Sequence, residues 1–410
     1  MRVLIIGGGL GGLCLAHGLK GAGIDVAVFE RNSGPTDGLA GYGIHLNMTG
    51  WEALRICLPP AQFETLDKIS THAGSRLQFL DEKLHLLAQR NDADIPGSAN
   101  AMRRGIGRIE LRRILLDGLE DVVHFSKTFV RFERIDAGTV RAVFADGTFA
   151  DGTVLVGADA SHSKVRQQYL PKIHRLDLGV MTIAGRYMLT DESARLLPGY
   201  FADGTLNNIV PLAPDWMFVA AWSLDPDKGS GALGGSNFIV WAYVAARSSL
   251  PDNADKMTGA QLQPLVLDRV KAWHPAITTL VKQADIATIA PVALRSMPKL
   301  TRWPPSNITL LGDAIHNMTP MAGIGANTAL KDAAVLTGVL TAAKASRKPI
   351  SKAIGDYEAQ MRTYANAAVS TSMRNSLNAV DGNMVKRFGF RTALKVAEAV
   401  PPVKKMMFKP

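Results

Sequence analysis

The chain has 410 residues, 47% of them hydrophobic and 20% charged, with a formal net charge of +10. This length predicts two or three domains, and the composition is ordinary for a soluble globular protein. Because the only cysteines are Cys14 and Cys57, we expect no structural disulfide and a reducing, cytoplasmic location. The charge comes without a nucleic-acid recognition motif. No Cys/His cluster suggests a metal site, and no apolar run reaches the roughly 18 residues that span a bilayer.

The first thirty residues follow the order strand, glycine turn, helix, strand and acidic residue. Gly7 permits a tight turn, Gly9 lets the backbone approach a pyrophosphate, and Gly12 lets the helix pack closely against the strand. Glu30 stands eighteen positions after Gly12, where a carboxylate can accept hydrogen bonds from ribose hydroxyls and disfavours a 2′-phosphate. The stretch therefore predicts a dinucleotide-binding βαβ unit for FAD or NAD rather than NADP.

An excursion over residues 75–100 separates this unit from the next predicted helix, and we assign it to a second domain. The helix is amphipathic, because its leucine and isoleucine side chains share one face. Arg108 stands at its start. We interpret Arg112 and Arg113 as part of its solvated face, which is the common position for arginine.

Two later strands are apolar on both faces and end in short polar motifs. The strand over residues 153–157 runs into Gly-Ala-Asp-Ala, and the strand over 308–311 runs into Gly-Asp-Ala-Ile-His. Strands of this kind are typical of the middle of a parallel sheet. Residues 170–282 differ, since their strand-length runs alternate and are separated by Gly, Pro, Asp and Ser, as in antiparallel sheets.

These patterns predict an α/β protein with a Rossmann-like domain that contains a parallel sheet. We expect that domain to comprise residues 1–169 and 283–345. A smaller α+β domain with an antiparallel sheet should cover residues 170–282, and a C-terminal helical segment residues 346–410.

Three motifs stand in a fixed order: the glycine turn at 7–12, Gly157-Ala158-Asp159-Ala160, and 312–316. As a set they resemble the motifs of the single-component (group A) FAD-dependent aromatic hydroxylases, the family of p-hydroxybenzoate hydroxylase. The likeness covers essentially residues 1–345. It implies non-covalent FAD, NAD(P)H as co-substrate, and a flavin hydroperoxide that transfers one oxygen atom of O₂. The expected substrate is an electron-rich, aromatic or polycyclic small molecule, as in secondary metabolism.

The resemblance also implies cofactor-binding roles for particular positions. The first set holds the ADP half and the phosphate–ribityl region, apart from Asp159, which falls on a motif associated with FAD and nicotinamide handling. The second set lies at the ribityl chain and the isoalloxazine. The implied residues are Gly7, Gly9, Gly12, Glu30, Arg31, Arg108 and Asp159 in the first set, and Asp313, Pro320, Gly323, Gly325, Ala326 and Asn327 in the second.

The chain departs from the family pattern at one of these motifs. The family has glycine after the middle-motif aspartate, whereas this chain has Ala160. If that position needs a positive φ, alanine costs about 1 kcal/mol. His316 fits the pattern, and it could equally be a structural residue that closes a turn.

On the substrate side, the resemblance makes His45, Arg186 and Tyr187 the polar candidates for catalysis. Gly185 would let its strand approach the flavin, with Arg186 directed at the flavin or the substrate. Alternatively, the strand is an edge and Arg186 reaches water or a carboxylate. Aromatic residues on the neighbouring strands could line an apolar pocket or pack in a core; they are Phe218, Trp222, Phe238, Trp241 and Tyr243.

Other functions stay open. An FAD oxidase or dehydrogenase could use the same scaffold without oxygen transfer, and a flavin- or ligand-binding protein without turnover is a third possibility. A flavin halogenase is disfavoured, since no Trp-x-Trp-x-Ile-Pro stretch occurs. The basic tail from Lys386 to Pro410 could form a helix that caps the FAD-binding domain, or it could attach weakly to an anionic membrane surface.

Overall fold

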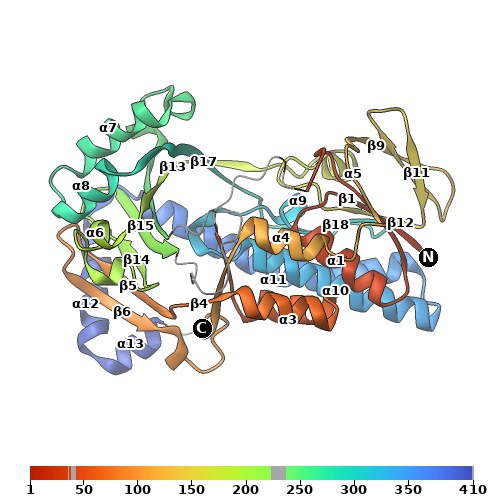
Figure 1. Ribbon diagram of the computed structural model, residues 1–410, viewed down its shortest axis with the longest axis horizontal. Coiled ribbons are helices and arrows are strands. Elements are labelled where there is room, and N and C mark those ends of the chain that lie inside the picture. Colours follow the sequence, from red (N-terminus) through yellow and green to blue (C-terminus); the bar gives the residue numbers. More distant parts are fainter. Residues whose placement is uncertain (36, 38–42, 223–236, 409–410) are drawn as a thin grey trace. The chain divides into compact units, whose positions relative to one another are not determined.

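The computed structural model describes residues 1–35, 37, 43–222 and 237–408. The chain divides into two compact units, which Figure 1 shows in the colours of the sequence. The first unit comprises residues 1–70, 106–176 and 295–373, and the second comprises residues 71–105, 177–294 and 374–410.

These boundaries differ from the predicted ranges in four places, the first being that residues 170–176 belong to the first unit. The excursion covers residues 71–105, and residues 283–294 belong to the second unit. The C-terminal helices form no segment of their own, because helix α11 (Ile350–Ala379) belongs to the first unit up to residue 373. The helices after it belong to the second unit.

A five-stranded parallel sheet organises the first unit, in the order β18-β12-β1-β2-β8. Strands β12 and β1 lie inside it and are buried on both faces, as the apolar runs predict. A second, antiparallel sheet has the order β11-β10-β9. The strands of this unit are β1 (Arg2–Ile6), β2 (Asp25–Phe29), β3 (Gly43–Leu46), β8 (Val123–His124), β9 (Phe129–Arg134), β10 (Val140–Phe144), β11 (Phe149–Gly152), β12 (Val154–Gly157) and β18 (Ile308–Leu310).

Helices pack on the parallel sheet and complete the apolar core of the first unit. Helix α10 packs against α1 and α2, so the N-terminal βαβ unit and the last predicted motif share one core. Besides α11, the helices are α1 (Leu10–Gly21), α2 (Met48–Cys57), α3 (Pro60–Ile69), α4 (Arg108–Leu116), α5 (Lys164–Tyr169), α9 (Asp313–His316) and α10 (Gly325–Ser346).

Burial makes one acid of this unit, Glu358, hold its proton to a higher pH than an exposed glutamate does. Glu358 on α11 is 1% exposed and accepts a hydrogen bond from Thr309 Oγ1 at 3.0 Å. Burial raises the pKa of Glu358 to about 7 from an ordinary 4.5. Between these two values the folded chain keeps a proton that the unfolded chain has released. Stability must therefore fall as pH rises through this window, by up to roughly 3 kcal/mol.

A Glu358→Gln variant should remove this pH dependence, because glutamine is neutral at every pH and nearly the same size. We expect its free energy of unfolding to exceed that of the parent by up to roughly 3 kcal/mol at pH 8.5, with little difference at pH 5. Urea titrations at the two pH values measure this, with exposed Glu192→Gln as the control. An equal change at both pH values would contradict the assignment.

A seven-stranded sheet organises the second unit, in the order β17-β13-β16-β15-β14-β5-β6. Strands β13, β16, β15 and β14 pair antiparallel in that order, and so do β5 and β6, whereas β14 and β5 pair in parallel because the excursion inserts β5 beside β14. The predicted antiparallel sheet is confirmed, with this one parallel pair inside it. The strands are β4 (Thr71–Ala73), β5 (Arg76–Leu80), β6 (Leu86–Asn91), β7 (Arg103–Gly107), β13 (Leu176–Met188), β14 (Leu206–Ile209), β15 (Asp215–Trp222), β16 (Phe238–Ala246) and β17 (Asp285–Ser296).

Helices α7 (Gly259–Val270) and α8 (Pro275–Lys282) share a core with one face of this sheet. Trp241 and Tyr243 are buried in that core. Alternation places Phe218 and Phe238 on the opposite face. The remaining helices of the unit are α6 (Asp191–Ala194), α12 (Met384–Ala399) and α13 (Pro401–Met407). No helix in the described part of the chain combines the length and the apolar character that a bilayer span requires.

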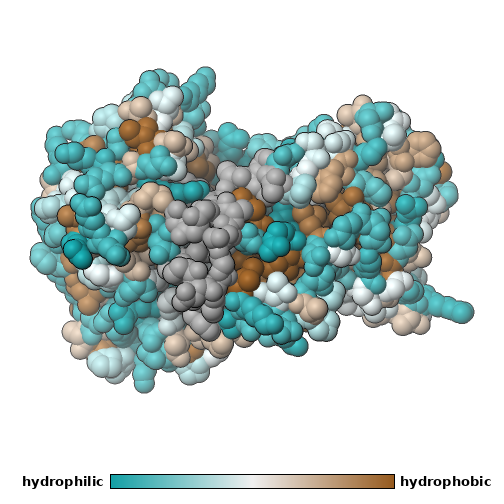
Figure 2. Space-filling model, viewed as in Figure 1, coloured by the Kyte–Doolittle hydropathy of each residue, from teal (hydrophilic) through white to brown (hydrophobic). Residues whose placement is uncertain are grey.

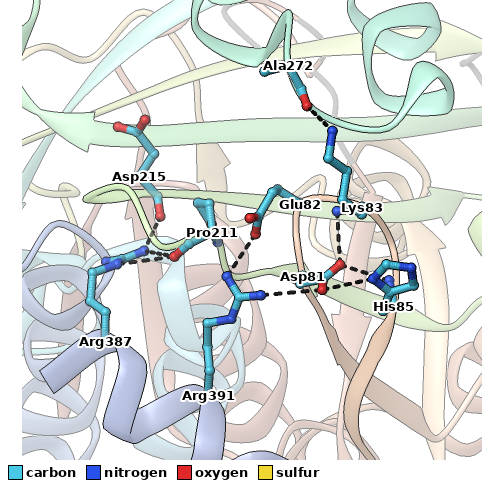
Figure 3. Close-up of polar contacts among 9 residues, drawn as sticks. All are labelled: Asp81, Glu82, Lys83, His85, Pro211, Asp215, Ala272, Arg387 and Arg391. Carbon is cyan, nitrogen blue, oxygen red and sulfur yellow. Dashed lines mark hydrogen bonds and ion pairs between the residues drawn. The ribbon is translucent and has the colours of Figure 1, made fainter. Parts of the chain in front are cut away.

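Two inward arginines anchor α12 to the second unit (Figure 3). Arg387 is buried and donates to the carbonyls of Pro211, at 2.9 Å, and Asp215, at 2.6 Å. Arg391 pairs with Glu82 at 2.9 Å and with Asp81 at 3.3 Å. One of the two alternatives for the tail was a cap on the FAD-binding domain. Instead it packs within the second unit, because these arginines find their acceptors there.

Candidate functional site

The glycine turn after β1 has the geometry that its sequence predicts. Gly7 adopts φ +113°, and a Cβ there would come within 2.4 Å of the carbonyl oxygen of Ala158. A Cβ on Gly12 would come within 2.2 Å of the carbonyl oxygen of Gly7. These two positions admit only glycine, because the strand, the turn and the helix approach each other so closely.

Gly9 serves a different purpose, since a Cβ built on it meets no atom within 4 Å. It is the N-cap of α1, it has extended φ and ψ, and it has no side-chain cap. No acidic residue lies in the first turn of that helix. The first N–H groups of α1 and its positive dipole end therefore face the space beside Gly9, which suits a phosphate group.

Glu30 lies at the end of β2, beside this turn, and is 7% exposed. Its Oε2 accepts a hydrogen bond from the backbone N of Gly8 at 2.8 Å, and its Oε1 accepts one from the backbone N of Asn32 at 2.9 Å. Each carboxylate oxygen can accept a second hydrogen bond, so Glu30 can still bind ribose hydroxyls. The neighbouring Arg31 is exposed.

Arg112 is not on a solvated face, contrary to our interpretation. Its side chain is buried, Nε donates to the Gly8 carbonyl at 3.2 Å, and an Nη lies 3.8 Å from Glu30 Oε2. Arg112 thus ties α4 to the glycine turn and balances the charge of Glu30. Arg113 is exposed as predicted, and so is Arg108 at the first position of α4.

Asp159 follows β12 and caps α5. Its Oδ2 accepts hydrogen bonds from the backbone N of Lys164 at 2.8 Å and of Val165 at 3.2 Å. Burial raises the pKa of Asp159. The next residue, Ala160, adopts φ +61°, so the glycine that the family has there would meet a real conformational need.

Replacing Ala160 with glycine should raise the free energy of unfolding by about 1 kcal/mol, because alanine is strained at positive φ. A thermal or urea melt measures the effect. Ala342→Gly at an exposed position of helix α10 is the matched control, and it should lower stability by about 1 kcal/mol. If both substitutions destabilise the protein equally, the strain at Ala160 is not real.

The third motif forms a tight turn that exposes one carboxylate. Gly312 has φ +61°, and Asp313 follows as the exposed first residue of α9. His316, at the end of α9, is fully buried, and its Nε2 lies 2.6 Å from Asp332 Oδ2. Burial alone would lower the pKa of His316, but the charge of Asp332 overrides it and raises the pKa. His316 is therefore a structural residue of this turn.

The small-residue loop after α9 leads into a second uncapped helix. Pro320 begins a short 3-10 turn, which ends at Gly323 with φ +64°. Helix α10 begins at Gly325, followed by Ala326, with no side-chain cap and no acidic residue in its first turn. Its N–H groups and dipole can therefore stabilise negative charge on a bound group.

Asn327 joins this helix to the segment around β3. Its Oδ1 accepts a hydrogen bond from the backbone N of Asn47 at 2.9 Å, and its Nδ2 donates to the carbonyl oxygen of His45 at 2.9 Å. A Cβ on Gly50 would come within 2.2 Å of the Asn327 Oδ1. The structure thus brings Asn327 and His45, two of the predicted site residues, together at the start of α10.

Arg186 lies in the second unit, on a strand that is not an edge, since β13 lies between β17 and β16. Its guanidinium stacks on the ring of Phe238, with the two centres 4.9 Å apart. Gly185 does not make room for a flavin in this unit. A Cβ there would come within 2.8 Å of the Trp241 ring, so the glycine accommodates that indole.

Tyr187 points to the opposite face from Arg186. It is 1% exposed within the core under α7 and α8, and its hydroxyl donates to the carbonyl oxygen of Ser193 at 3.0 Å. This packing position removes Tyr187 from the catalytic candidates. Across the described ranges, no group of three His, Cys, Asp or Glu residues is arranged to hold a metal ion.

The model of the FAD binding domain family matches residues 1–372. The chain belongs to this family of group A flavoprotein monooxygenases. FAD is the cofactor of the family, and three features of the first unit suit its binding. There is open space beside Gly9, the N-termini of α1 and α10 have no side-chain cap, and Asp313 is exposed.

Known proteins extend this family assignment. A crystal structure from Photorhabdus luminescens subsp. laumondii, described as an FAD-containing monooxygenase, is 47% identical with a TM-score of 0.85, over 93% of this chain and 98% of that one. HpxO from Klebsiella pneumoniae, solved with FAD and uric acid, shares the fold at 23% identity and a TM-score of 0.80, over 99% and 95% of the two chains. The dual O-methyltransferase/FAD-dependent monooxygenase CTB3 of Cercospora beticola is 30% identical over 388 residues, which cover 88% of this chain and 44% of CTB3. The present chain therefore spans less than half the length of that relative.

Proposed function

We propose that the protein is an FAD-dependent monooxygenase that uses NAD(P)H and O₂ to hydroxylate or epoxidise an electron-rich small molecule. The observation that carries the proposal is the constellation of the first unit: two uncapped helix N-termini, a buried Glu30 and an exposed Asp313. Bound FAD would supply the redox chemistry, accepting electrons from NAD(P)H and activating O₂.

Different residues of the first unit would hold different parts of FAD. With FAD bound, the N–H groups beside Gly9 would hold the diphosphate, Glu30 would accept from the ribose, and Asp313 would accept from the ribityl hydroxyls. The N-terminus of α10, which starts at Gly325, would stabilise negative charge on the reduced cofactor. Such a dipole is worth roughly 0.3–2 kcal/mol.

The substrate is proposed to be aromatic or polycyclic, and its contacts to come from the face of the seven-stranded sheet that carries Arg186. Phe218 and Trp222 lie on that face by alternation and are partly exposed, so a flat apolar ring can stack there. Arg186 is the charged group proposed to meet the substrate on this face, and His45 is the second catalytic candidate. The uric acid bound by the Klebsiella relative is a flat nitrogen heterocycle of this general kind.

Substrate-stimulated NAD(P)H oxidation tests the proposal. NAD(P)H should be oxidised slowly by the FAD-loaded protein alone and faster with the right compound from a panel of uric acid, phenols and polycyclic aromatics. No turnover of NAD(P)H under any condition would favour a ligand-binding protein without catalysis. Turnover that yields only H₂O₂ and a desaturated product would favour an oxidase or dehydrogenase.

Two finer assignments concern location and surroundings. We propose a cytoplasmic location, supported by two buried cysteines that are both free thiols.

We also propose weak contact between α12 and an anionic membrane. With Arg387 turned inward, the outer face of this helix carries Val385, Phe388 and Val396, which are 81%, 64% and 45% exposed. Lys395, also exposed, lies beside this strip.

Vesicle co-sedimentation measures this contact. The protein should sediment with phosphatidylserine vesicles at low salt, bind poorly to neutral vesicles, and lose its binding at high salt. Phe388→Ser should weaken binding several-fold. Phe149→Ser, at an exposed apolar position of the first unit, is the matched control and should not. Equal sedimentation of all variants would contradict a contact through α12.

In Figure 2 hydrophilic residues cover most of the face in view, with apolar residues among them.

A further inference from the structure

Asp332 is a fully buried carboxylate on α10 that receives three hydrogen bonds from two separate elements, α9 with its N-cap and α11. Its Oδ2 accepts from the backbone N of Gly312 at 2.7 Å and lies 2.6 Å from His316 Nε2. Its Oδ1 accepts from the hydroxyl of Tyr364, on α11, at 2.6 Å. Such a carboxylate is stable in a core only because these donors replace water.

Two of the three donors belong to one small element. Gly312 is the N-cap of α9, and His316 is its last residue. Helix α9 has only four residues, too few to be stable without outside support. The exposed Asp313 is its first residue, so whatever fixes α9 also fixes the direction of that carboxylate.

We propose that Asp332 is a positioning residue for FAD binding. It clamps both ends of α9 and thereby holds Asp313 in the orientation that meets the ribityl chain, while Tyr364 fixes the Asp332 carboxylate. The inference rests on the proposed role of Asp313. It assigns no contact between Asp332 and FAD, because Asp332 is fully buried.

A general role in stability would be the simpler explanation, and the bonding pattern argues against it. A buried acid that only fills a core needs donors, but these could come from any neighbouring group. Glu358 provides the comparison: it is equally buried, and it bonds to Thr309 within β18 rather than to α9. Asp332 and Glu358 are therefore both buried carboxyl groups, but only Asp332 is connected to Asp313 through α9.

The test measures the dissociation constant of FAD and the free energy of unfolding of the apoprotein for each variant. Asp332→Asn should weaken FAD binding about tenfold or more, because a charge-assisted bond to the turn is lost. Tyr364→Phe should weaken it about threefold. Glu358→Gln should leave the FAD dissociation constant unchanged even where it alters stability. If Asp332→Asn lowers only stability, with FAD affinity intact in the folded protein, the inference is wrong.

A double-mutant cycle with exposed Asp313→Ala gives the sharper result. If Asp332 acts through Asp313, the effect of Asp332→Asn on FAD affinity should largely disappear in the Asp313→Ala background. Additive effects would overturn the inference. Should Asp332→Asn fail to fold, Tyr364→Phe takes its place in the same cycle. If Asp313→Ala alone leaves FAD affinity unchanged, the assignment of Asp313 fails first, and the inference fails with it.

Discussion

A Gly9→Val chain should fold like the parent and yet emerge colourless, with FAD affinity reduced by at least about 100-fold. A Cβ at this position meets no protein atom within 4 Å, so the substitution disturbs no packing. The valine methyl groups instead occupy the space in front of the N-terminus of α1, where a diphosphate must approach the backbone. FAD absorbance of the purified protein and a titration of the apoprotein with FAD measure the loss.

Gly21→Val is the matched control for this prediction. Gly21 is the last residue of the same helix, and a Cβ on it also meets nothing within 4 Å. The control should bind FAD as the parent does, so any shared loss would reflect helix damage. A Gly9→Val protein that keeps its full complement of FAD would contradict the placement of the cofactor.

The second large effect is expected for Arg186→Ala. The variant should retain its fold and FAD but form product about 100- to 1,000-fold more slowly, with NAD(P)H electrons passing to H₂O₂ instead. Arg186 stacks on Phe238 on the face of the seven-stranded sheet opposite α7 and α8, where a guanidinium can orient an oxyanion of the substrate. The ratio of product to NAD(P)H consumed is the measurement, together with H₂O₂.

Arg195→Ala, at an exposed position of the same unit, provides the control and should leave that ratio unchanged. Arg186→Lys separates charge from geometry, because lysine keeps the charge but cannot stack or donate as a planar fork. If Arg186→Ala couples NAD(P)H to product as well as the parent does, Arg186 is only a strand residue.

The sequence was most informative where the chemistry is local. Gly7 and Gly12 must be glycine for reasons that lie within a few residues, and the structure confirms the βαβ geometry around them. Ala160 was flagged by its departure from a motif, and it does adopt a positive φ. Local backbone requirements depend on adjacent residues, so a sequence pattern can reveal them.

Side-chain partners far apart in the chain were harder to predict. Arg112 was assigned to a solvated face because its helix is amphipathic, although its acceptor at Gly8 lies 104 positions earlier. Arg186 and Tyr187 are adjacent in β13 and point to opposite faces of the sheet. The sequence could not show which face the helices cover, so Tyr187 and Gly185 were given functional roles. One feature of the sequence could have indicated that Asp332 is buried and paired: it is an acidic residue among the apolar residues of α10.

The most direct test of the central claim is a turnover with ¹⁸O₂, NAD(P)H and the aromatic compound that most accelerates NAD(P)H oxidation. The account predicts that each product molecule carries one ¹⁸O atom, seen by mass spectrometry as a gain of two mass units over product made in ¹⁶O₂. Product without label, formed while NAD(P)H is consumed and labelled H₂O₂ accumulates, would contradict oxygen transfer and identify an oxidase.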